Sequence, residues 1–431
     1  MPSRRALLLA SLSVAALLLA GGEFAARRAD IPVPDRADLF ELWTLGDDPV
    51  FVPDGGDRLR THPELSAIDN APVSFAAARP AGTRRVVCLG GSTTAGWPFH
   101  PRGSYPARLG AYLRDLRPDA RVEVVNAGFH NFDSRREVSV ARELARLRPT
   151  AALVYSGFND YQTYLARSGA GRLLSLARAP HRFLLRRSRL YGWLRWKAGL
   201  SGSRTVASAF VLPLNRAQEE RLLAEHRRNL EETARVLSAA GAQVVLVPLA
   251  WEPGFDPAFA PQELFARMNE GVRAVAGRTG ARVLETGGVL RRADFVDTEH
   301  LSLEGYAKLA RAAARELCRG ALADAPCREG RLRSEAAYRK ELGIADPMWL
   351  AHARLRLGLV YSGRGLLAAA GRELEEAERL SPVPGFILDR VLFQRDPALL
   401  ELLARADERL GFADRARAAR EACGLLRRSG R

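Results

Sequence analysis

A serine follows directly on a pair of glycines at the end of an apolar run. The run Val86–Leu89 is typical of a buried strand, and Gly90 and Gly91 permit a tight turn and a close backbone approach. Ser92 comes next, where a parallel strand would pass into a helix, and in a doubly wound sheet ligands bind at that edge. A serine there can act as a nucleophile, and its backbone N–H can help to hold an oxyanion. The stretch is equally typical of a glycine-rich turn with a serine N-cap.

Two other kinds of glycine-rich loop do not fit this stretch. A Walker-type phosphate loop requires lysine after its second glycine, whereas Trp97 follows Gly96 here. The G-x-S-x-G elbow requires glycine at the position that Thr94 occupies. Ser92 is therefore a candidate nucleophile or a helix cap, and the choice depends on what the rest of the chain places beside it.

Three further motifs follow predicted strands or precede a predicted helix. Gly128 ends an Asn-Ala-Gly motif after the second predicted strand, and Asn159 belongs to a Gly-Phe-Asn-Asp motif after the third. Asp297 and His300 are the outer residues of an Asp-Thr-Glu-His motif just before the last helix of the sheet-forming region. Because the loops at the carboxyl ends of parallel strands open on one edge of the sheet, we expect all four motifs to meet there.

Each of these residue types suits one step of nucleophilic acyl chemistry. Ser92 would attack a carbonyl carbon, His300 would take the serine proton, and Asp297 would orient the imidazole and stabilise its charge. The backbone N–H groups of Ser92 and Gly128 and the side-chain amide of Asn159 would converge on the oxyanion that develops.

Strands and helices must alternate to bring such loops together, and the sequence predicts that alternation. Apolar, β-branched runs of strand length lie between stretches of helix length, which is typical of a parallel sheet covered on both faces. The predicted strands are 86–89, 122–126, 151–156, 243–248 and 282–285, and the predicted helices are 104–116, 134–147, 217–240, 261–279 and 302–318.

With these four motifs in this order, residues from about 85 to 319 resemble the SGNH hydrolases, also called GDSL-type hydrolases. The Gly-Asp-Ser of the family name is Gly-Gly-Ser here, which is similar to membrane-anchored members with Gly-Gly-Ser-Thr-Thr. The resemblance implies an α/β class, with a flavodoxin-like three-layer α/β/α fold, an acyl–serine intermediate, no metal and no cofactor. It also implies the site residues, with Ser92, Asp297 and His300 as catalytic residues and Ser92, Gly128 and Asn159 as the oxyanion hole.

Other polar residues beside the motifs are candidates for substrate contact, namely Thr93, His130, Asp160 and Tyr161. Residues of these types more often cap a helix or pack against neighbours, so both interpretations stay open for them. The sequence contains no His-Glu-x-x-His motif and no run of clustered cysteine and histidine, which also predicts that no metal ion is bound.

The first residues have the chemistry of an export signal. Arg4 and Arg5 precede an apolar run over residues 6–20. The run is at the upper limit for a cleaved signal and short for a membrane span, so both a signal peptide and a signal-anchor over 1–26 fit, and we favour the anchor. In either case the positive-inside rule predicts that the rest of the chain lies outside the cytoplasm, in the cell envelope or periplasm if anchored, or secreted if cleaved.

The chain carries 65 Lys and Arg against 49 Asp and Glu, a formal net charge of +16. That charge fits nucleic acid, an anionic membrane or an arginine-rich composition alone, and without a nucleic-acid motif we expect no nucleic-acid partner. The insertion 161–218 contains no acidic residue and interleaves aromatic residues with arginines. It is typical of a basic amphipathic helix on an anionic membrane or of a lid over the site, and equally of a solvated face whose aromatics pack inward.

After Cys318 the pattern becomes entirely helical beyond a polar linker. The small and large positions of one tetratricopeptide-type repeat coincide with Leu357, Gly358, Tyr361, Gly365, Ala370, Ala377 and Pro382. A repeat-like module would offer a surface to a protein partner, and an ordinary helical hairpin is the alternative. Cys318 and Cys327 flank a short loop and would pair in an oxidising compartment.

These observations divide the chain into five predicted segments. They are the signal 1–26, an irregular membrane-proximal extension 27–84, a hydrolase-like domain 85–319, a linker 320–345 and a helical module 346–431. The predicted function is a serine esterase or deacylase acting on O-acyl groups, acetyl above all, of envelope glycan or on lipid esters. An O-acetyltransferase of the same fold is one alternative, because the acceptor depends on pocket shape. A non-catalytic envelope scaffold that binds protein through its helical module is another.

Overall fold

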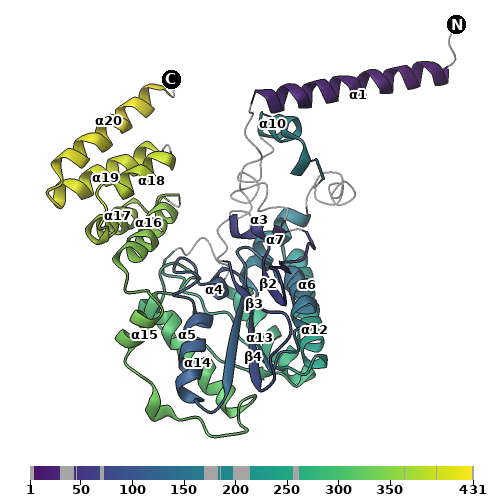
Figure 1. Cartoon of the computed structure of the whole chain (residues 1–431), viewed down its shortest axis with the longest axis vertical. Coiled ribbons are helices and arrows are strands. Elements are labelled where there is room, and N and C mark those ends of the chain that lie inside the picture. Colours follow the sequence, from purple (N-terminus) through teal and green to yellow (C-terminus); the bar gives the residue numbers. More distant parts are fainter. Residues whose placement is uncertain are drawn as a thin grey trace. The chain divides into compact units, whose positions relative to one another are not determined.

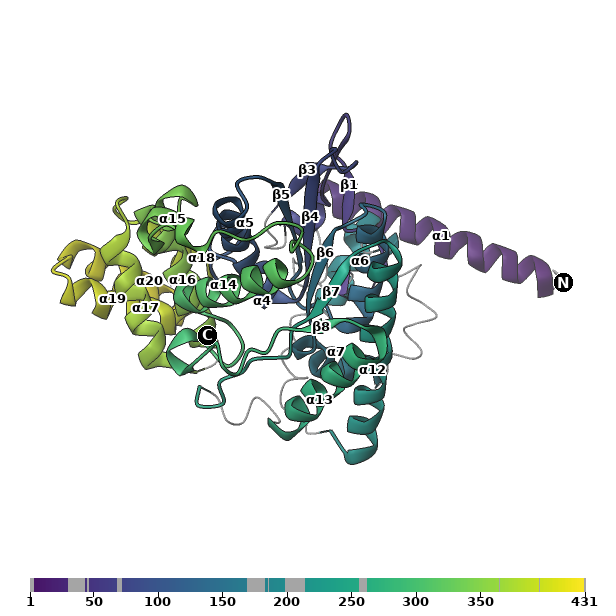
Figure 2. The same ribbon diagram turned by 90° about the horizontal axis from the view of Figure 1, so that it is seen from below.

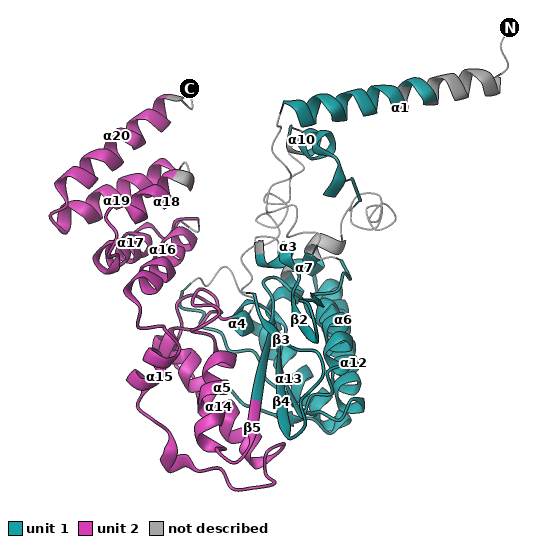
Figure 3. Ribbon diagram, in the orientation of Figure 1, with its two compact units in different colours: residues 1–95, 123–288 teal, residues 96–122, 289–431 magenta. Residues whose placement is uncertain are grey.

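The computed structural model describes residues 4–29, 43–44, 46–67, 72–168, 183–184, 186–197, 214–255, 262–363, 365–394 and 396–429 (Figure 1). They form two compact units that each combine separate stretches of sequence. The first unit contains residues 1–95 and 123–288, and the second contains residues 96–122 and 289–431 (Figure 3). These units cut across the five predicted segments, so the predicted domain boundaries stay predictions.

A five-stranded sheet organises the first unit, with the strand order β5-β4-β6-β7-β8 (Figure 2). Strand β4 pairs with β6, β6 with β7 and β7 with β8, all in parallel. Numbered along the chain, the order is 2-1-3-4-5, which is the flavodoxin-like order. The strands are β4 (Thr83–Gly90), β5 (Arg121–Gly128), β6 (Ala151–Tyr155), β7 (Gln243–Leu246) and β8 (Arg282–Val283). The predicted parallel α/β sheet is thereby confirmed.

In the described part of the first unit, the helices over residues 134–145, 216–239 and 262–279 lie close to predicted positions, whereas those over residues 92–95 and 158–168 were not predicted. They are α4 (Ser92–Ala95), α6 (Ser134–Ala145), α7 (Phe158–Ser168), α12 (Arg216–Ala239) and α13 (Gln262–Thr279). Figure 2 shows α6 and α12 lying side by side. The start of α6 is set by Asp133, whose side chain accepts the N–H of Arg136, and α12 begins with a capping box at Asn215. Leu89, Val140 and Leu230 bring β4, α6 and α12 into one apolar core.

We predicted an irregular extension before this sheet, but the part of it that the structure describes contains regular elements. It contains helix α3 (Pro63–Ala67) and an antiparallel sheet of β1 (Phe51–Pro53), β2 (Arg58–Thr61) and β3 (Ser74–Ala76). Strands of three or four residues are too short for their alternation to stand out in sequence. Tertiary packing stabilises them instead: Phe51 packs edge-on against Phe75 and Phe129, and Glu143 of α6 accepts the N–H groups of Val50 and Phe51.

The N-terminal residues form helix α1 (Arg4–Arg28), and its end contacts helix α10 (Arg189–Lys197) of the basic insertion. Glu23 accepts the hydroxyl of Ser188 at 2.7 Å and the N–H of Leu190 at 3.1 Å. Burial opposes ionisation of Glu23, but these bonds and that from Arg27 outweigh it and lower its pKa to about 2. In the described part of the chain, no helix combines the length and apolar composition needed to cross a membrane.

Of the basic insertion, residues 169–182, 185 and 198–213 lie outside the described residues. In the described part, Phe183 is 61% exposed and Leu194 is 48% exposed, so not all apolar side chains pack inward. Arg186 forms ion pairs with Asp48 at 3.1 Å and with Glu64 at 2.8 Å. The contact of this insertion with a membrane stays a prediction.

In the second unit, α5 (Tyr105–Leu116) packs on α14 (Leu303–Arg319), both within one residue of their predicted bounds. The predicted disulfide between Cys318 and Cys327 is confirmed, with the two Cα atoms 6.0 Å apart. The segment 320–345, expected to be a polar linker, instead contains helix α15 (Glu335–Glu341). Glu335 accepts hydrogen bonds from Arg108 and from Tyr112 of α5. These two buried residues are far from Glu335 in the sequence, so a local sequence pattern could not predict that they stabilise a helix here.

Five helices follow, as the sequence predicted for the end of the chain (Figure 1). They are α16 (Pro347–Gly363), α17 (Leu367–Leu380), α18 (Phe386–Gln394), α19 (Pro397–Arg409) and α20 (Ala413–Ser429). Gly358 lets α16 approach Leu374 and the Ala370 carbonyl of α17, which is the close packing that a repeat of this type requires. The assignment to the tetratricopeptide repeat itself stays a prediction.

Asp407 of α19 is fully buried, and within the described residues neither of its carboxylate oxygens has a hydrogen-bond partner. Burial raises its pKa to about 7, and the nearby Glu378 carboxylate adds to the rise. The unfolded chain loses this proton near pH 4, whereas the folded chain keeps it until about pH 7. The free energy of unfolding should therefore fall as the pH rises through this range.

We predict that Asp407→Asn raises the melting temperature by a few degrees at pH 7.5, because the amide carries no charge to desolvate. Near pH 4, where Asp407 is protonated in the folded chain, the two proteins should melt at similar temperatures. Thermal unfolding followed by circular dichroism at both pH values measures this. An Asp407→Asn protein that is no more stable than the wild type at pH 7.5 would contradict the prediction.

Candidate active site

Ser92 is the first residue of α4 and is 7% exposed. Strand β4 ends at Gly90, and a Cβ added there would collide with the Thr94 side chain and the Tyr155 carbonyl of β6. A Cβ added at Gly91 would collide with the Asn159 side-chain amide. Both glycines are therefore required for the close approach of the strand ends, which supports the reason given for them from sequence.

Gly128, at the end of β5, packs directly against the backbone of α4. A Cβ at this position would overlap the Ala95 nitrogen and the Thr94 carbonyl carbon. The N–H of Phe129 donates to the Gly90 carbonyl at 3.0 Å, which joins the same two loops. The N–H of Gly128 itself donates to the Asn126 side chain at 2.9 Å, so its place in an oxyanion hole stays a prediction.

Asn159 lies in the first turn of α7, directly after β6, and is 4% exposed. Its side-chain nitrogen donates to the Phe132 carbonyl at 2.9 Å. This bond uses one of the two N–H groups of the amide and holds it beside Gly91. The first unit thus gathers Ser92, Gly128 and Asn159 at the carboxyl ends of neighbouring strands, where doubly wound sheets bind ligands.

Asp297 and His300 form a buried pair in the second unit. The Asp297 Oδ2 atom lies 2.8 Å from His300 Nδ1, and the two residues are 1% and 6% exposed. Asp297 Oδ1 accepts the N–H groups of Glu299 at 2.9 Å and His300 at 2.7 Å. With Nδ1 bonded to the carboxylate, Nε2 is the nitrogen that can accept a proton, so the pair has the geometry of a general base and its orienting carboxylate.

The loop of this pair is held at both ends. The N–H of Val296 donates to the His300 carbonyl at 2.9 Å, which closes the turn. Ser302 then caps α14 by accepting the Gly305 N–H at 3.1 Å. A Cβ at Gly305 would collide with the Asp294 carbonyl, so the helix start packs tightly on the preceding turn. These local bonds place the Asp-x-x-His motif as the sequence predicted.

Trp97, to which the sequence gives no role in the site, lies near His300, and His100 stacks on Trp97. The Trp97 ring is 6.3 Å from the His300 ring, edge to face, and 5.8 Å from the His100 ring, stacked on it. The Tyr306 hydroxyl holds this segment by donating to the Trp97 carbonyl at 2.6 Å. No sequence pattern links Trp97 or His100 to the Asp-Thr-Glu-His motif, so the sequence assigns neither residue a role in the site.

The four candidates for substrate contact follow the carboxyl ends of strands β4, β5 and β6 in the first unit. Thr93 is 8% exposed in α4, and the imidazole Nε2 of His130 is buried. The Asp160 carboxylate accepts the Ser134 N–H at 3.0 Å and also the Ser134 hydroxyl, which places it at the start of α6. Tyr161 is 7% exposed, and burial raises its pKa. Substrate contact by any of these residues stays a prediction.

A buried acid beneath this edge escaped sequence analysis. Glu137 of α6 is 1% exposed, and burial raises its pKa well above the usual value. His226 is fully buried, and burial lowers its pKa to about 4. At neutral pH the His226 imidazole is therefore uncharged, so it contributes packing rather than charge.

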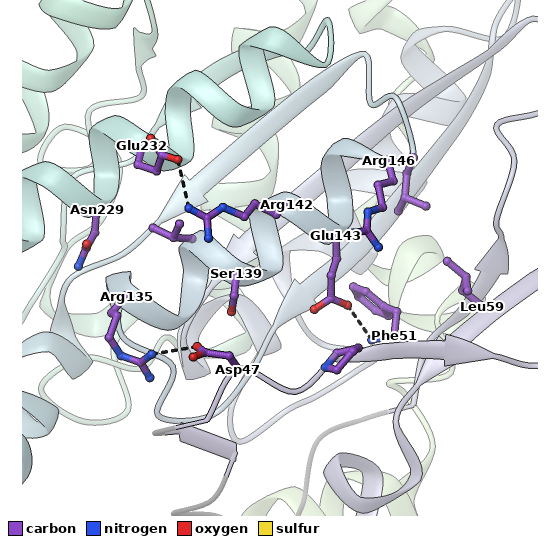
Figure 4. Close-up of a pocket in the computed structure, with 13 residues that line it drawn as sticks. Asp47, Phe51, Leu59, Arg135, Ser139, Arg142, Glu143, Arg146, Asn229 and Glu232 are labelled. Atoms are coloured by element: carbon purple, nitrogen blue, oxygen red, sulfur yellow. Dashed lines mark hydrogen bonds and ion pairs between the residues drawn. The ribbon is translucent and has the colours of Figure 1, made fainter. Parts of the chain in front are cut away.

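A cavity of about 850 Å³ lies elsewhere in the first unit, between α6, α12 and the N-terminal extension (Figure 4). Its charged lining is paired: Arg135 binds Asp47 at 3.0 Å, and Arg142 binds Glu232 at 3.3 Å. None of the predicted site residues lines it. The sequence motifs and this cavity therefore mark different parts of the unit.

Ser92, Gly128 and Asn159 belong to the first unit, and Asp297 and His300 belong to the second. Each group has the local geometry expected of it, and the pairing of Ser92 with His300 stays a prediction. Within the described residues, no group of three or more His, Cys, Asp or Glu side chains could hold a metal ion.

In comparison with known families, residues 88–308 match the GDSL-like lipase/acylhydrolase family. Among solved structures, the chain is similar to a lipase/acylhydrolase from Enterococcus faecalis, with 17% identity, a TM-score of 0.36 and coverage of 54% of this chain and 95% of that one. It is also similar to an acetylxylan esterase from Geobacillus stearothermophilus, with 16% identity, a TM-score of 0.35 and coverage of 54% and 94%. No curated protein matches the chain.

The packing of Gly128 against α4 leads to a direct test. Gly128→Ala should push α4 away, because the new Cβ would overlap backbone atoms that cannot move alone. We expect a lower melting temperature and slower labelling of Ser92 by a fluorophosphonate probe. Gly277→Ala in α13 is the matched control, since a Cβ there meets nothing within 4 Å and alanine favours a helix. If Gly128→Ala behaves like the control in both measurements, the close packing does not position Ser92.

Proposed function

Because the chain belongs to the GDSL-like lipase/acylhydrolase family, and is a serine hydrolase that acts on ester bonds, we propose that Ser92, His300 and Asp297 carry out the hydrolysis. The observation that carries this assignment is the buried bond of 2.8 Å between Asp297 Oδ2 and His300 Nδ1. A carboxylate fixed by two backbone N–H groups keeps the imidazole in one orientation and stabilises the positive charge that it gains.

In the proposed reaction, His300 Nε2 takes the hydroxyl proton of Ser92 as Ser92 Oγ attacks the ester carbonyl carbon. The carbonyl oxygen becomes an oxyanion, which the N–H groups of Ser92 and Gly128 and the Asn159 amide would stabilise. Collapse of this intermediate breaks the ester C–O bond, and His300 gives its proton to the departing alcohol. A water molecule then attacks the acyl–serine by the same route, which releases the acid and restores Ser92.

The arrangement of Asn159 supports its part in this scheme. Its amide is buried, is held by the Phe132 carbonyl at 2.9 Å and lies beside Gly91, one residue before the nucleophile. A donor that is already fixed in place loses no freedom when the oxyanion forms, which is the source of its catalytic value. For the Gly128 N–H to take part, its bond to the Asn126 side chain must be shared with the oxyanion or given up.

The finer proposal for the substrate is an O-acyl group, acetyl above all, on envelope glycan or a lipid ester. It is supported by the Gly-Gly-Ser-Thr-Thr sequence at residues 90–94 and by the export chemistry of the first residues. A panel of acetylated oligosaccharides, short-chain nitrophenyl esters and longer acyl esters distinguishes the two classes. Hydrolysis of long acyl esters alone would remove the glycan from the proposal.

We also infer that the chain is exported to the cell envelope, with its N-terminal segment as anchor or signal. Arg4, Arg5 and the apolar run that follows support this, and so does the disulfide Cys318–Cys327, since disulfides persist in oxidising compartments. We expect the full chain in a bacterial host to reach the envelope fraction with both cysteines oxidised. A variant without residues 1–26 should stay in the cytoplasm with both thiols reduced. Reduced cysteines in the full chain would contradict the proposal.

For the reaction itself, Ser92→Ala should lower kcat for a nitrophenyl ester by several orders of magnitude, because the nucleophile is lost. Asn159→Ala should lower kcat by roughly 10²–10³-fold with a smaller effect on KM, as for other oxyanion donors. Fluorophosphonate labelling, followed by peptide mass spectrometry, should mark Ser92 in the wild type. Near-full activity of the Ser92→Ala protein, or a label on another residue, would remove the assignment.

A further inference from the structure

The first helix of the C-terminal module touches the loop that carries Asp297 and His300. Both belong to the second unit. The Tyr361 hydroxyl, at the end of α16, donates to the backbone carbonyl of Val296. Tyr361 is 6% exposed and Val296 is 9% exposed, so this bond is shielded from water. A helix predicted to belong to a separate module is therefore bonded to the residue directly before Asp297.

This bond restrains the backbone of the turn because of its position there. The N–H of Val296 already donates to the His300 carbonyl at 2.9 Å, so Val296 is bonded to the turn through its N–H and to Tyr361 through its carbonyl. Rotation of the peptide between Val296 and Asp297 would break the bond to Tyr361 and leave a buried carbonyl without its partner. Tyr361 thereby limits the orientations that the backbone of Asp297 can take.

A second contact from the same helix reaches the other neighbour of His300. The Arg356 guanidinium lies 5.9 Å from the centre of the Trp97 ring, and its Nη1 is 2.9 Å from His100 Nε2. Trp97 in turn faces the His300 ring edge to face at 6.3 Å. Two side chains of α16 therefore contact neighbours of His300: Tyr361 bonds to the Val296 backbone, and Arg356 lies over the Trp97 ring.

A third contact fixes the start of the helix. The Trp349 ring lies 6.2 Å from the Phe99 ring, in the segment between Trp97 and His100. Helix α16 thus contacts this segment and the Asp-x-x-His turn along its length, at residues 349, 356 and 361. A helix that served only to present a partner surface would not need a buried bond to the Asp-x-x-His turn together with ring contacts to the other segment.

We propose that the C-terminal helical module is part of the catalytic apparatus, with Tyr361 as the positioning residue for the Asp297–His300 pair. The inference rests on the proposed function, in which that pair is the general base. Tyr361 does not touch the reacting atoms and acts through the Val296 backbone. Its loss should slow the chemical step, because a small displacement of the histidine misaligns it with Ser92, while substrate affinity should hardly change.

The test is Tyr361→Phe in the full chain, which removes only the hydroxyl. We expect kcat for a nitrophenyl ester to fall by roughly 10-fold, within the 10²-fold loss that a 1 Å misplacement can cause. KM should stay within about twofold, since no substrate contact is removed. The rate of fluorophosphonate labelling at Ser92 should fall in parallel, because it also depends on the base.

Tyr338→Phe is the matched control for the loss of a buried tyrosine hydroxyl. Tyr338 of α15 is fully buried and donates to Asp115 at 2.6 Å, so its substitution should lower stability without a fall in kcat. Arg356→Met is the second variant, since it removes the contact with Trp97 and leaves Tyr361 in place. We expect it to lower kcat by roughly threefold with KM unchanged.

The inference is overturned if Tyr361→Phe and Arg356→Met both keep kcat within twofold of the wild type, or if Tyr338→Phe lowers kcat as much as Tyr361→Phe. If Tyr361→Phe does not fold, Arg356→Met decides by the same criterion. Failure of the proposed function looks different: Ser92→Ala would then keep its activity, or the probe would label another residue. A wild type that depends on Ser92 while Tyr361→Phe and Arg356→Met are fully active would refute only the positioning role.

Discussion

Close backbone packing at the ends of β4, β5 and β6 is the constraint on which the first unit depends. A Cβ added at Gly90 would overlap Thr94 and the Tyr155 carbonyl, one at Gly91 would overlap the Asn159 side chain, and one at Gly128 would overlap the backbone of α4. Removing the side chain lets the ends of the strands and the short helix α4 come within van der Waals distance of one another. The cost of this packing is the conformational entropy that three glycines lose on folding. Its result is that Ser92 and the Asn159 amide lie at the same edge of one sheet.

Two buried carboxylates of this chain, those of Asp297 and Asp407, differ in the hydrogen-bond donors around them. Asp297 is buried with the His300 imidazole at 2.8 Å and two backbone N–H groups on its other oxygen. Asp407 is equally buried, lacks hydrogen-bond partners among the described residues and has its pKa raised to about 7. A buried carboxylate stays ionised only where donors replace the water that it has lost. The turn that holds Asp297 supplies those donors within four residues of chain.

The second unit brings together elements that the sequence separates by some 200 residues. Glu335 of α15 accepts hydrogen bonds from Arg108 and Tyr112 of α5, and α5 packs on α14. The Tyr361 bond to Val296 belongs to the same set. Helix α16 is thereby bonded to the turn of Asp297 and His300 through buried groups, which hold their geometry because leaving one unpaired is unfavourable. A module that looked like an appendage in sequence therefore contributes to the part of the unit where the chemistry is proposed.

Sequence analysis alone was sufficient for the strands of the parallel sheet and its longer helices apart from α7, for the order of the four motifs and for the pairing of Cys318 with Cys327. These are local properties, because apolar periodicity, glycine pairs and the Asp-x-x-His spacing act over a few residues. The partners in space could be read only from the three-dimensional structure: β1, β2 and β3 form a sheet, α15 lies within the expected linker, and Trp97 and Tyr361 lie beside the turn of Asp297 and His300. Each of these depends on a partner far away in the chain. Burial against distant residues is what stabilises these elements. A sequence pattern over ten residues does not show which distant side chain will cover them.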